Sequence, residues 1–189
     1  ILPHPKNTGN GRYSYLAAWG YALKQPGGND KTAQEFVGKL LKNAPLFAAG
    51  GRDATTTFMQ RRLGDVLVTF ESEAELIAKE FGKGGFEVVY PSLSILAEFP
   101  VALVEKVVDK KNSRTQAKAY LDYLWSKEGQ EIAAQNYLRP RDPEMLKKYA
   151  TSFPSIKTFS VDEVFGGWDK AVPIHFKDGG TFDQIYQGK

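Results

Sequence analysis

The sequence predicts an α/β fold, in which helices and a sheet pack in layers. Short apolar runs typical of buried strands alternate along the chain with segments of helical periodicity. Hydrophobic residues make up 42% of the chain and aromatic residues 13%, which is too many for a disordered chain. A length of 189 residues suffices for one large domain, or two small ones, with a real core.

The first half of the chain carries this alternation most clearly. The helix that begins at Tyr13 is apolar on nearly every side, which is typical of a helix buried on several faces. Ser72 and Glu75 have the spacing of a capping box. In order, the pattern predicts a helix at 13–23, a helix at 31–41 capped by Asp30, a strand at 45–49, a helix at 55–62, a strand at 65–70, a helix at 72–81 ended by glycines at 82–85, and a strand at 86–90.

The second half begins with a change of pattern. Pro91 and Pro100 enclose a linker-like stretch, so we place a boundary here between two parts, residues 1–91 and 92–189. Beyond this stretch, the pattern predicts a strand at 101–108, helices at 114–126 and 127–137, a stiff break at 139–143, and a helix from 168 to 176.

Composition and charge exclude several classes of protein. The formal charge of +3 comes from 25 basic and 22 acidic residues spread along the chain, so we expect no basic face for nucleic acid. No apolar run reaches the roughly 18–20 residues of a membrane span, so we expect no membrane insertion. There is no cysteine and the only histidines are His4 and His175, which severely limits catalytic chemistry. We therefore expect no enzyme and no cofactor.

Three carboxylates straddle the end of the strand predicted at 65–70. Asp65, Glu71 and Glu73 can resemble a metal site or an acid–base cluster. Helix capping and a solvated surface explain the same residues more simply, so we expect no metal here.

Two glycine-bearing loops, each leading into a predicted helix, are the strongest functional signal. The first spans residues 6–12 (KNTGNGR) and the second residues 50–53 (GGRD). A helix N-terminus has unpaired backbone N–H groups and a partial positive charge, and glycine lets an anion approach that backbone closely. The first loop lacks the Gly-Lys-Ser/Thr ending of a nucleotide P-loop. The two loops together predict an oxyanion receptor.

Further motifs are spread over the whole chain. They are residues 7–12 (NTGNGR), 15–20 (YLAAWG), 64–67 (GDVL), 94–98 (SILAE), 128–133 (EGQEIA), 137–142 (YLRPRD), 162–168 (DEVFGGW) and 179–185 (GGTFDQI). Together they resemble the periplasmic sulfate/thiosulfate-binding proteins, the receptors of sulfate-uptake ABC importers. The last two stretches are especially specific, and the resemblance covers essentially all 189 residues.

The resemblance implies a type II periplasmic binding fold, with two α/β lobes and the anion between them. Such proteins hold a dehydrated dianion through backbone N–H groups and neutral donors. Residues 1–91 would form most of the second, anion-binding lobe, and residues 92–189 the return into the first lobe plus the terminal helices. The motifs match the later part of a family member, and the chain begins at Ile1 without methionine. We therefore expect the N-terminal part of the receptor to be missing.

The resemblance also implies the anion-binding residues. The Ser-Gly-Gly loop of the family falls on Thr8, Gly9 and Asn10, where Asn10 keeps the N–H but adds a side chain. A further backbone donor falls on Gly51, and the tryptophan donor of the family is replaced by Phe70, which has no N–H. A lost hydrogen bond to a charged ligand is worth about 1.5–3 kcal/mol, so the choice between sulfate, thiosulfate and another oxyanion stays open.

Arg12 and Arg52 are expected to support the site. Arg12 lies just inside the first helix, where it either pairs with the anion or, as we favour, braces the loop, and Arg52 follows Gly51. The remaining family ligands belong to the part that this chain lacks. We therefore expect the 189-residue chain to bind the anion weakly.

The expected function is high-affinity capture of sulfate or thiosulfate and its delivery to the membrane permease of an ABC importer. The expected location is the periplasm, or the outer surface with a lipid anchor in a Gram-positive organism. One alternative is the anion-sensing effector domain of a transcription regulator with the same fold. An enzyme on this fold, such as a transferase, is a third and weaker alternative.

Overall fold

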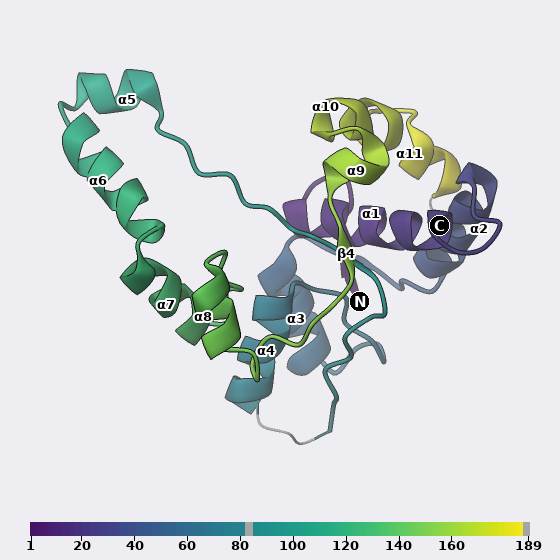
Figure 1. The fold of residues 1–189 in the computed structure, drawn as a ribbon. Helices are drawn as coiled ribbons and strands as arrows, with labels where there is room; N and C mark the ends of the chain where they lie inside the picture. The colour runs from purple at the N-terminus through teal and green to yellow at the C-terminus, as the bar shows by residue number, and fades with distance from the viewer. Residues whose placement is uncertain (82–84, 187–189) are drawn as a thin grey trace. The chain divides into compact units, whose positions relative to one another are not determined.

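The computed structural model describes residues 1–81 and 85–186 (Figure 1). The chain divides into two compact units. Unit 1 consists of residues 1–97 and 156–189, and unit 2 of residues 98–155. These units do not coincide with the parts expected at 1–91 and 92–189. That boundary concerns the lobes of a whole receptor and stays a prediction.

Unit 1 combines helices with two short parallel strand pairs. Leu2 of β1 lies opposite Phe47 of β2, and Ser94 of β3 lies opposite Thr158 of β4. Parallel pairs that join distant segments confirm the α/β class. The elements are β1 (Leu2–Pro3), α1 (Gly9–Leu23), α2 (Asp30–Lys42), β2 (Phe47–Ala48), α3 (Gly51–Met59), α4 (Glu71–Phe81), β3 (Ser94–Ile95), β4 (Thr158–Phe159), α9 (Val161–Phe165), α10 (Trp168–Ala171), the π-helical turn η1 (Val172–Phe176) and α11 (Thr181–Ile185).

Helix α1 is the centre of unit 1. Tyr15 and Leu16 are fully buried, and α2 packs along the helix through Val37 and Leu41. The C-terminal segments pack on the same core (Figure 1). The apolar residues on every side of α1 are therefore explained by burial on several faces, as the sequence predicts.

The caps of two helices differ from those expected. Asn29, not Asp30, caps α2: the Asn29 side chain accepts from the Thr32 N–H at 3.1 Å, and the Asn29 N–H donates to the Thr32 hydroxyl at 2.9 Å. Helix α4 begins at Glu71, so Ser72 lies inside it and the capping box with Glu75 is wrong. Glu75 instead accepts a hydrogen bond from the Tyr90 hydroxyl.

The strands expected at 65–70, 86–90 and 101–108 are wrong. Residues 65–70 run beside Ile1, but two hydrogen bonds join them to it, from the Ile1 amino group to the Val66 carbonyl and from the Val68 N–H to the Ile1 carbonyl. Two hydrogen bonds to a single residue do not make a β-ladder. Residues 86–90 are irregular, and part of 101–108 is helical. The backbone N–H and C=O groups of a strand need a neighbouring strand to bond with, whereas those of a helix bond within the helix itself.

Unit 2 contains four helices within residues 98–155: α5 (Glu105–Lys110), α6 (Arg114–Leu124), α7 (Lys127–Gln135) and α8 (Pro143–Lys148). Helices α6 and α7 confirm the prediction to within two residues at each end. Helix α8 is not among the predicted elements, and it begins at the last residue of the stiff break predicted at 139–143. Asp142 caps α8 by accepting from the Glu144 and Met145 N–H groups, and Pro143 occupies its first turn.

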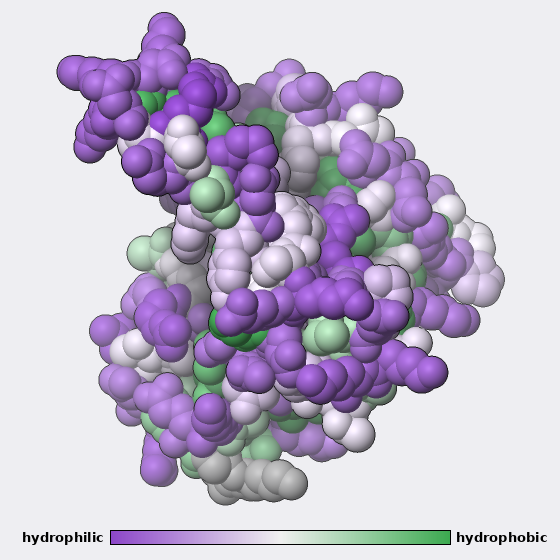
Figure 2. Space-filling model, turned by 60° about the vertical axis from the view of Figure 1, so that its left-hand side comes forward, coloured by the Kyte–Doolittle hydropathy of each residue, from purple (hydrophilic) through white to green (hydrophobic). Residues whose placement is uncertain are grey.

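Hydrophilic side chains cover most of the face shown in Figure 2. Among residues 1–81 and 85–186, no helix has the length and apolar character needed to cross a bilayer. The glycines expected to end a helix at 82–85 lie, apart from Gly85, outside the described residues.

Candidate anion site

The first glycine loop is fixed by Thr8, which caps α1. Thr8 is extended, with φ −132°, and its Oγ1 accepts from the Gly11 N–H at 2.9 Å. The same hydroxyl donates to the His4 carbonyl at 3.1 Å. In this structure Thr8 therefore caps α1, and its hydroxyl proton is donated to a backbone carbonyl. The hydroxyl would have to rotate away from the His4 carbonyl before it could donate to an anion.

Two backbone N–H groups of this loop are available. Those of Gly9 and Asn10 have no acceptor within the described part of the chain. Nothing lies within 4 Å of the position that a Cβ on Gly9 would take. This end of α1 therefore presents two N–H donors with open space beside Gly9, at the end where the helix carries its partial positive charge.

The side chain of Asn10 lies beside the start of the second loop. Asn10 is 7% exposed, and its Nδ2 donates to Thr69 Oγ1 at 3.2 Å while its Oδ1 accepts from Ser14 Oγ at 3.2 Å. A Cβ on Gly51 would lie 3.1 Å from Asn10 Nδ2, so the backbone at the start of α3 passes directly over this amide. Asn10 thus joins α1 to α3 and to the segment that enters α4.

The first backbone N–H groups of helix α3 are largely without acceptors in the described part of the chain. Gly50 is the cap and supplies no side chain, while the Gly50 carbonyl accepts from the Ala54 N–H at 3.0 Å. The N–H groups of Gly51 and Arg52 have no acceptor among the residues that the structure describes. The structure therefore places a second pair of open donors close to the first.

Phe70 lies at the entry to α4. Its carbonyl accepts from the Ala74 N–H at 3.0 Å, and its half-buried ring meets Tyr13 edge-on with centroids 5.9 Å apart. Its neighbour Thr69 binds Asn10, so Phe70 stands next to the two loops. Thr69 is the residue that sequence reasoning missed. Its position beside Phe70 was the available signal.

The two arginines hold different positions. Arg12 donates to the Lys6 carbonyl at 3.0 Å and lies over the Phe176 ring at 5.6 Å, so it braces the loop from the core side. Its Nε is buried and has no hydrogen-bond partner in the described chain. Arg52 is exposed and forms an ion pair with Glu73 at 3.4 Å. A supporting role of either arginine toward an anion stays a prediction.

The carboxylates near this site do not gather into a metal centre. Glu73 faces Arg52 and accepts from the Thr55 hydroxyl at 3.4 Å, which links α3 to α4. Within residues 1–81 and 85–186, no three histidine, aspartate or glutamate side chains form a group that could hold a metal. The simpler reading of Glu71 and Glu73, as residues of a helix N-terminus, agrees with the bounds of α4.

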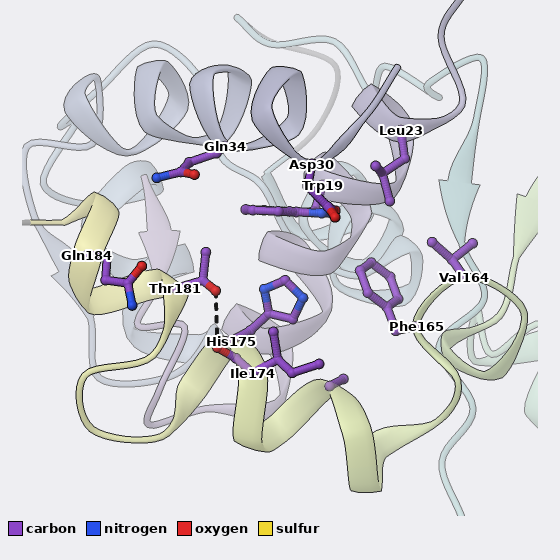
Figure 3. Close-up of a pocket in the computed structure, with 11 residues that line it drawn as sticks. Trp19, Leu23, Asp30, Gln34, Val164, Phe165, Ile174, His175, Thr181 and Gln184 are labelled. Atoms are coloured by element: carbon purple, nitrogen blue, oxygen red, sulfur yellow. Dashed lines mark hydrogen bonds between the residues drawn. The ribbon is translucent and has the colours of Figure 1, made fainter. Parts of the chain in front are cut away.

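A separate pocket of about 350 Å³ lies around His175 (Figure 3). His175 is 5% exposed, and its Nδ1 lies 3.2 Å from the Tyr15 hydroxyl. Burial lowers the pKa of His175 to about 4, against a smaller opposing effect of Asp30, and burial raises the pKa of Tyr15. His175 also packs edge-on against Trp19. It is a packed core residue, and the pocket contains none of the predicted anion-site residues.

Comparison with known proteins shows the class of protein to which this fold belongs, the solute-binding proteins. Residues 1–139 match the family described as bacterial extracellular solute-binding protein. The chain therefore belongs to that family. The sulfate-binding protein SubI from Mycobacterium tuberculosis has a similar structure, with a TM-score of 0.74 and 26% identity, over 94% of this chain and 59% of that one. The type II periplasmic binding fold expected for this chain is thus confirmed.

Within the family, the similar relatives bind sulfur oxyanions. The thiosulfate-binding protein of Pseudomonas aeruginosa is 64% identical over 98% of this chain and 56% of its own length. The sulfate-binding protein of Escherichia coli is 55% identical over 98% of this chain and 56% of its own length. The chain thus spans about half the length of these relatives. They are binding proteins rather than enzymes or regulators.

Proposed function

We propose that this chain supplies one side of an oxyanion site in a receptor that captures sulfate or thiosulfate. The observation that carries the proposal is the meeting of two open helix N-termini. The N–H groups of Gly9 and Asn10 at α1 and of Gly51 and Arg52 at α3 have no acceptor among the described residues, and the buried, neutral amide of Asn10 lies against Gly51 and donates to Thr69. Neutral donors on rigid helices stabilise a dianion without an added cation.

The whole receptor would deliver the anion to the membrane permease of an ABC importer, from the periplasm or the outer cell surface. The names of the relatives support this class of ligand, and the family description supports an extracellular location. In this proposal Thr8 caps α1, Arg12 stabilises the first glycine loop, and Phe70 occupies a position next to the anion. A cofactor has no part in it.

Calorimetric titration of the 189-residue chain with sulfate and with thiosulfate tests the proposal. We expect saturable binding with a dissociation constant well above the micromolar range, because this chain supplies only part of the donors. Nitrate serves as a control for general anion effects. Equal heats for nitrate and the two sulfur oxyanions, or no saturation with either, would contradict the proposed function.

Asn10→Asp should weaken anion binding. An added carboxylate at the N-terminus of α1 favours the helix by about 0.3–1 kcal/mol, but it repels a dianion at the same place. We expect sulfate and thiosulfate affinity to fall at least tenfold, and we expect the buried charge and the lost Nδ2 donor to lower unfolding stability as well. Asn29→Asp makes the same change at the start of α2 and should leave the affinity unchanged. Equal losses in both variants would assign the effect to net charge alone.

Phe70→Trp should strengthen binding. The indole N–H adds a donor at the entry to α4, and a hydrogen bond to a charged group is worth about 1.5–3 kcal/mol. We expect sulfate affinity to increase about tenfold or more, measured by the same titration. Phe70→Leu, which adds no donor, controls for changes in packing against Tyr13. An affinity for Phe70→Trp no better than that of Phe70→Leu would remove Phe70 from the proposed site.

A further inference from the structure

The pocket around His175 lies within unit 1 and shares no residue with the candidate anion site (Figure 3). Its volume of about 350 Å³ falls at the lower end of the range for small-molecule sites. Its wall combines apolar side chains, such as Trp19 and Phe165, with polar ones from α2, η1 and α11. Part of the wall comes from the motifs at 162–168 and 179–185, which the candidate anion site does not use.

The ring of His175 presents one nitrogen to the core and the other to this pocket. Tyr15 is fully buried, and its hydroxyl lies 3.2 Å from Nδ1 of His175, its partner in the described chain. A hydroxyl proton needs an acceptor, so Nδ1 accepts it and the proton of the neutral ring lies on Nε2. Nε2 has no hydrogen-bond partner among the described residues, yet the fully buried side-chain atom that lacks one there is Arg12 Nε. The Nε2–H of His175, a residue only 5% exposed, therefore opens into the pocket that it lines.

The turn that carries His175 has an uncommon form. In the π-helical turn η1, the Lys177 N–H donates to the Val172 carbonyl at 3.1 Å, five residues back. The Ile174 carbonyl accepts from the Thr181 hydroxyl at 3.1 Å, which joins η1 to α11 in the pocket wall (Figure 3). Single π-helical turns are rare and are frequently found at functional sites. The backbone thus fixes His175 at this wall.

Asp30 gives the pocket its charge. Among the lining residues, all of which the structure describes, Asp30 is the one charged at pH 7, because burial keeps His175 neutral. The Asp30 carboxylate forms no ion pair or hydrogen bond with the described residues. Trp19 and Phe165 add aromatic rings of the kind that attract cations.

We propose that this pocket binds a small organic ammonium ion with an apolar body and a hydrogen-bond acceptor. The ammonium group pairs with Asp30, the apolar body packs on Trp19 and Phe165, and the acceptor takes the Nε2–H of His175. An oxyanion does not suit this pocket, because Asp30 repels it and none of the lining residues is a cation. The site is therefore distinct from the candidate anion site in the chemistry of its ligand.

Titration of the 189-residue chain with tyramine at pH 7, followed in ¹H–¹⁵N spectra, tests this proposal. Tyramine carries an ammonium group, an aromatic ring and a hydroxyl, and we expect it to cause saturable shifts of the Trp19 indole N–H and of the η1 amides. 4-Hydroxyphenylacetate, in which a carboxylate replaces the ammonium group, should bind about tenfold or more weakly. Phenethylamine, which lacks the hydroxyl, should bind about threefold or more weakly. Equal affinities for tyramine and 4-hydroxyphenylacetate, or no saturable shift of these resonances with tyramine, would overturn the proposal.

Asp30→Asn and Asp169→Asn are matched variants that locate the ammonium group. Both aspartates are exposed in the first turn of a helix, but Asp169 of α10 does not line the pocket. Asn29, not Asp30, caps α2, so Asp30→Asn should leave the helix intact. We expect Asp30→Asn to weaken tyramine binding about tenfold and Asp169→Asn to change it less than about twofold. Equal effects of both would assign the attraction to net charge and overturn the site. Neither measurement depends on anion binding.

Discussion

Gly11→Ala should destabilise the protein by about 3 kcal/mol or more, because Gly11 lies against backbone and not against movable side chains. A Cβ at this position would lie 2.5 Å from the Pro3 carbonyl oxygen and closer still to that of His4. Relief would require β1 or the loop before α1 to shift. Denaturant unfolding followed by circular dichroism measures the loss.

Gly9→Ala is the matched control, two residues away at the start of the same helix. Nothing lies within 4 Å of its Cβ position, and alanine favours a helix over glycine by up to about 1 kcal/mol. We therefore expect Gly9→Ala to be neutral or slightly stabilising. Similar destabilisation by both substitutions would contradict the close approach of Gly11 to the preceding strand.

Acid should weaken the folded state through His175. Burial lowers the pKa of His175 from its usual value near 6.5 to about 4. Between these values the unfolded chain binds a proton that the folded chain does not, so stability is complete above pH 6.5 and falls as the pH drops toward 4. The loss from this residue should reach about 3 kcal/mol at most. Unfolding free energies measured at pH 7 and at pH 4.5 test it.

His175→Gln should remove most of this pH dependence, at the expense of packing against Trp19. His4 also has a lowered pKa, chiefly because of partial burial and then because of Lys6, but it is only half-buried. His4→Gln should therefore change the slope less than His175→Gln. A slope that His175→Gln leaves intact would assign the acid sensitivity to other groups.

The sequence predicts the longer helices of this protein well, and its short helices and its strands poorly. Helical periodicity and local caps are properties of neighbouring residues, which explains the success with α1, α2, α6 and α7. The apolar runs at 65–70 and 101–108 have strand composition, yet a strand also depends on a partner far away in sequence. Neither run has a ladder here, and the second turns into α5. The parallel partners that do form are two residues long.

The same distinction applies to the candidate site. The glycine loops at Thr8–Asn10 and Gly51 could be found from local chemistry, and the structure brings them together. The hydrogen bond that joins the first loop to the segment before α4 could not be predicted, because it runs from the Asn10 amide to Thr69, which is 59 residues away. From the sequence, Asn10 is a position where a larger residue replaces a glycine of the family loop. In the structure that added side chain hydrogen-bonds to Thr69 and Ser14 and lies against Gly51.

Amide chemical shifts during titration with thiosulfate test the central claim most directly. In ¹H–¹⁵N spectra of the 189-residue chain, the resonances of Gly9, Asn10, Gly51 and Arg52 should move together and saturate with one dissociation constant, and sulfate should move the same set. Saturable shifts centred on other residues, such as those around His175, or shifts reproduced by chloride at equal ionic strength, would contradict an oxyanion site at the ends of α1 and α3.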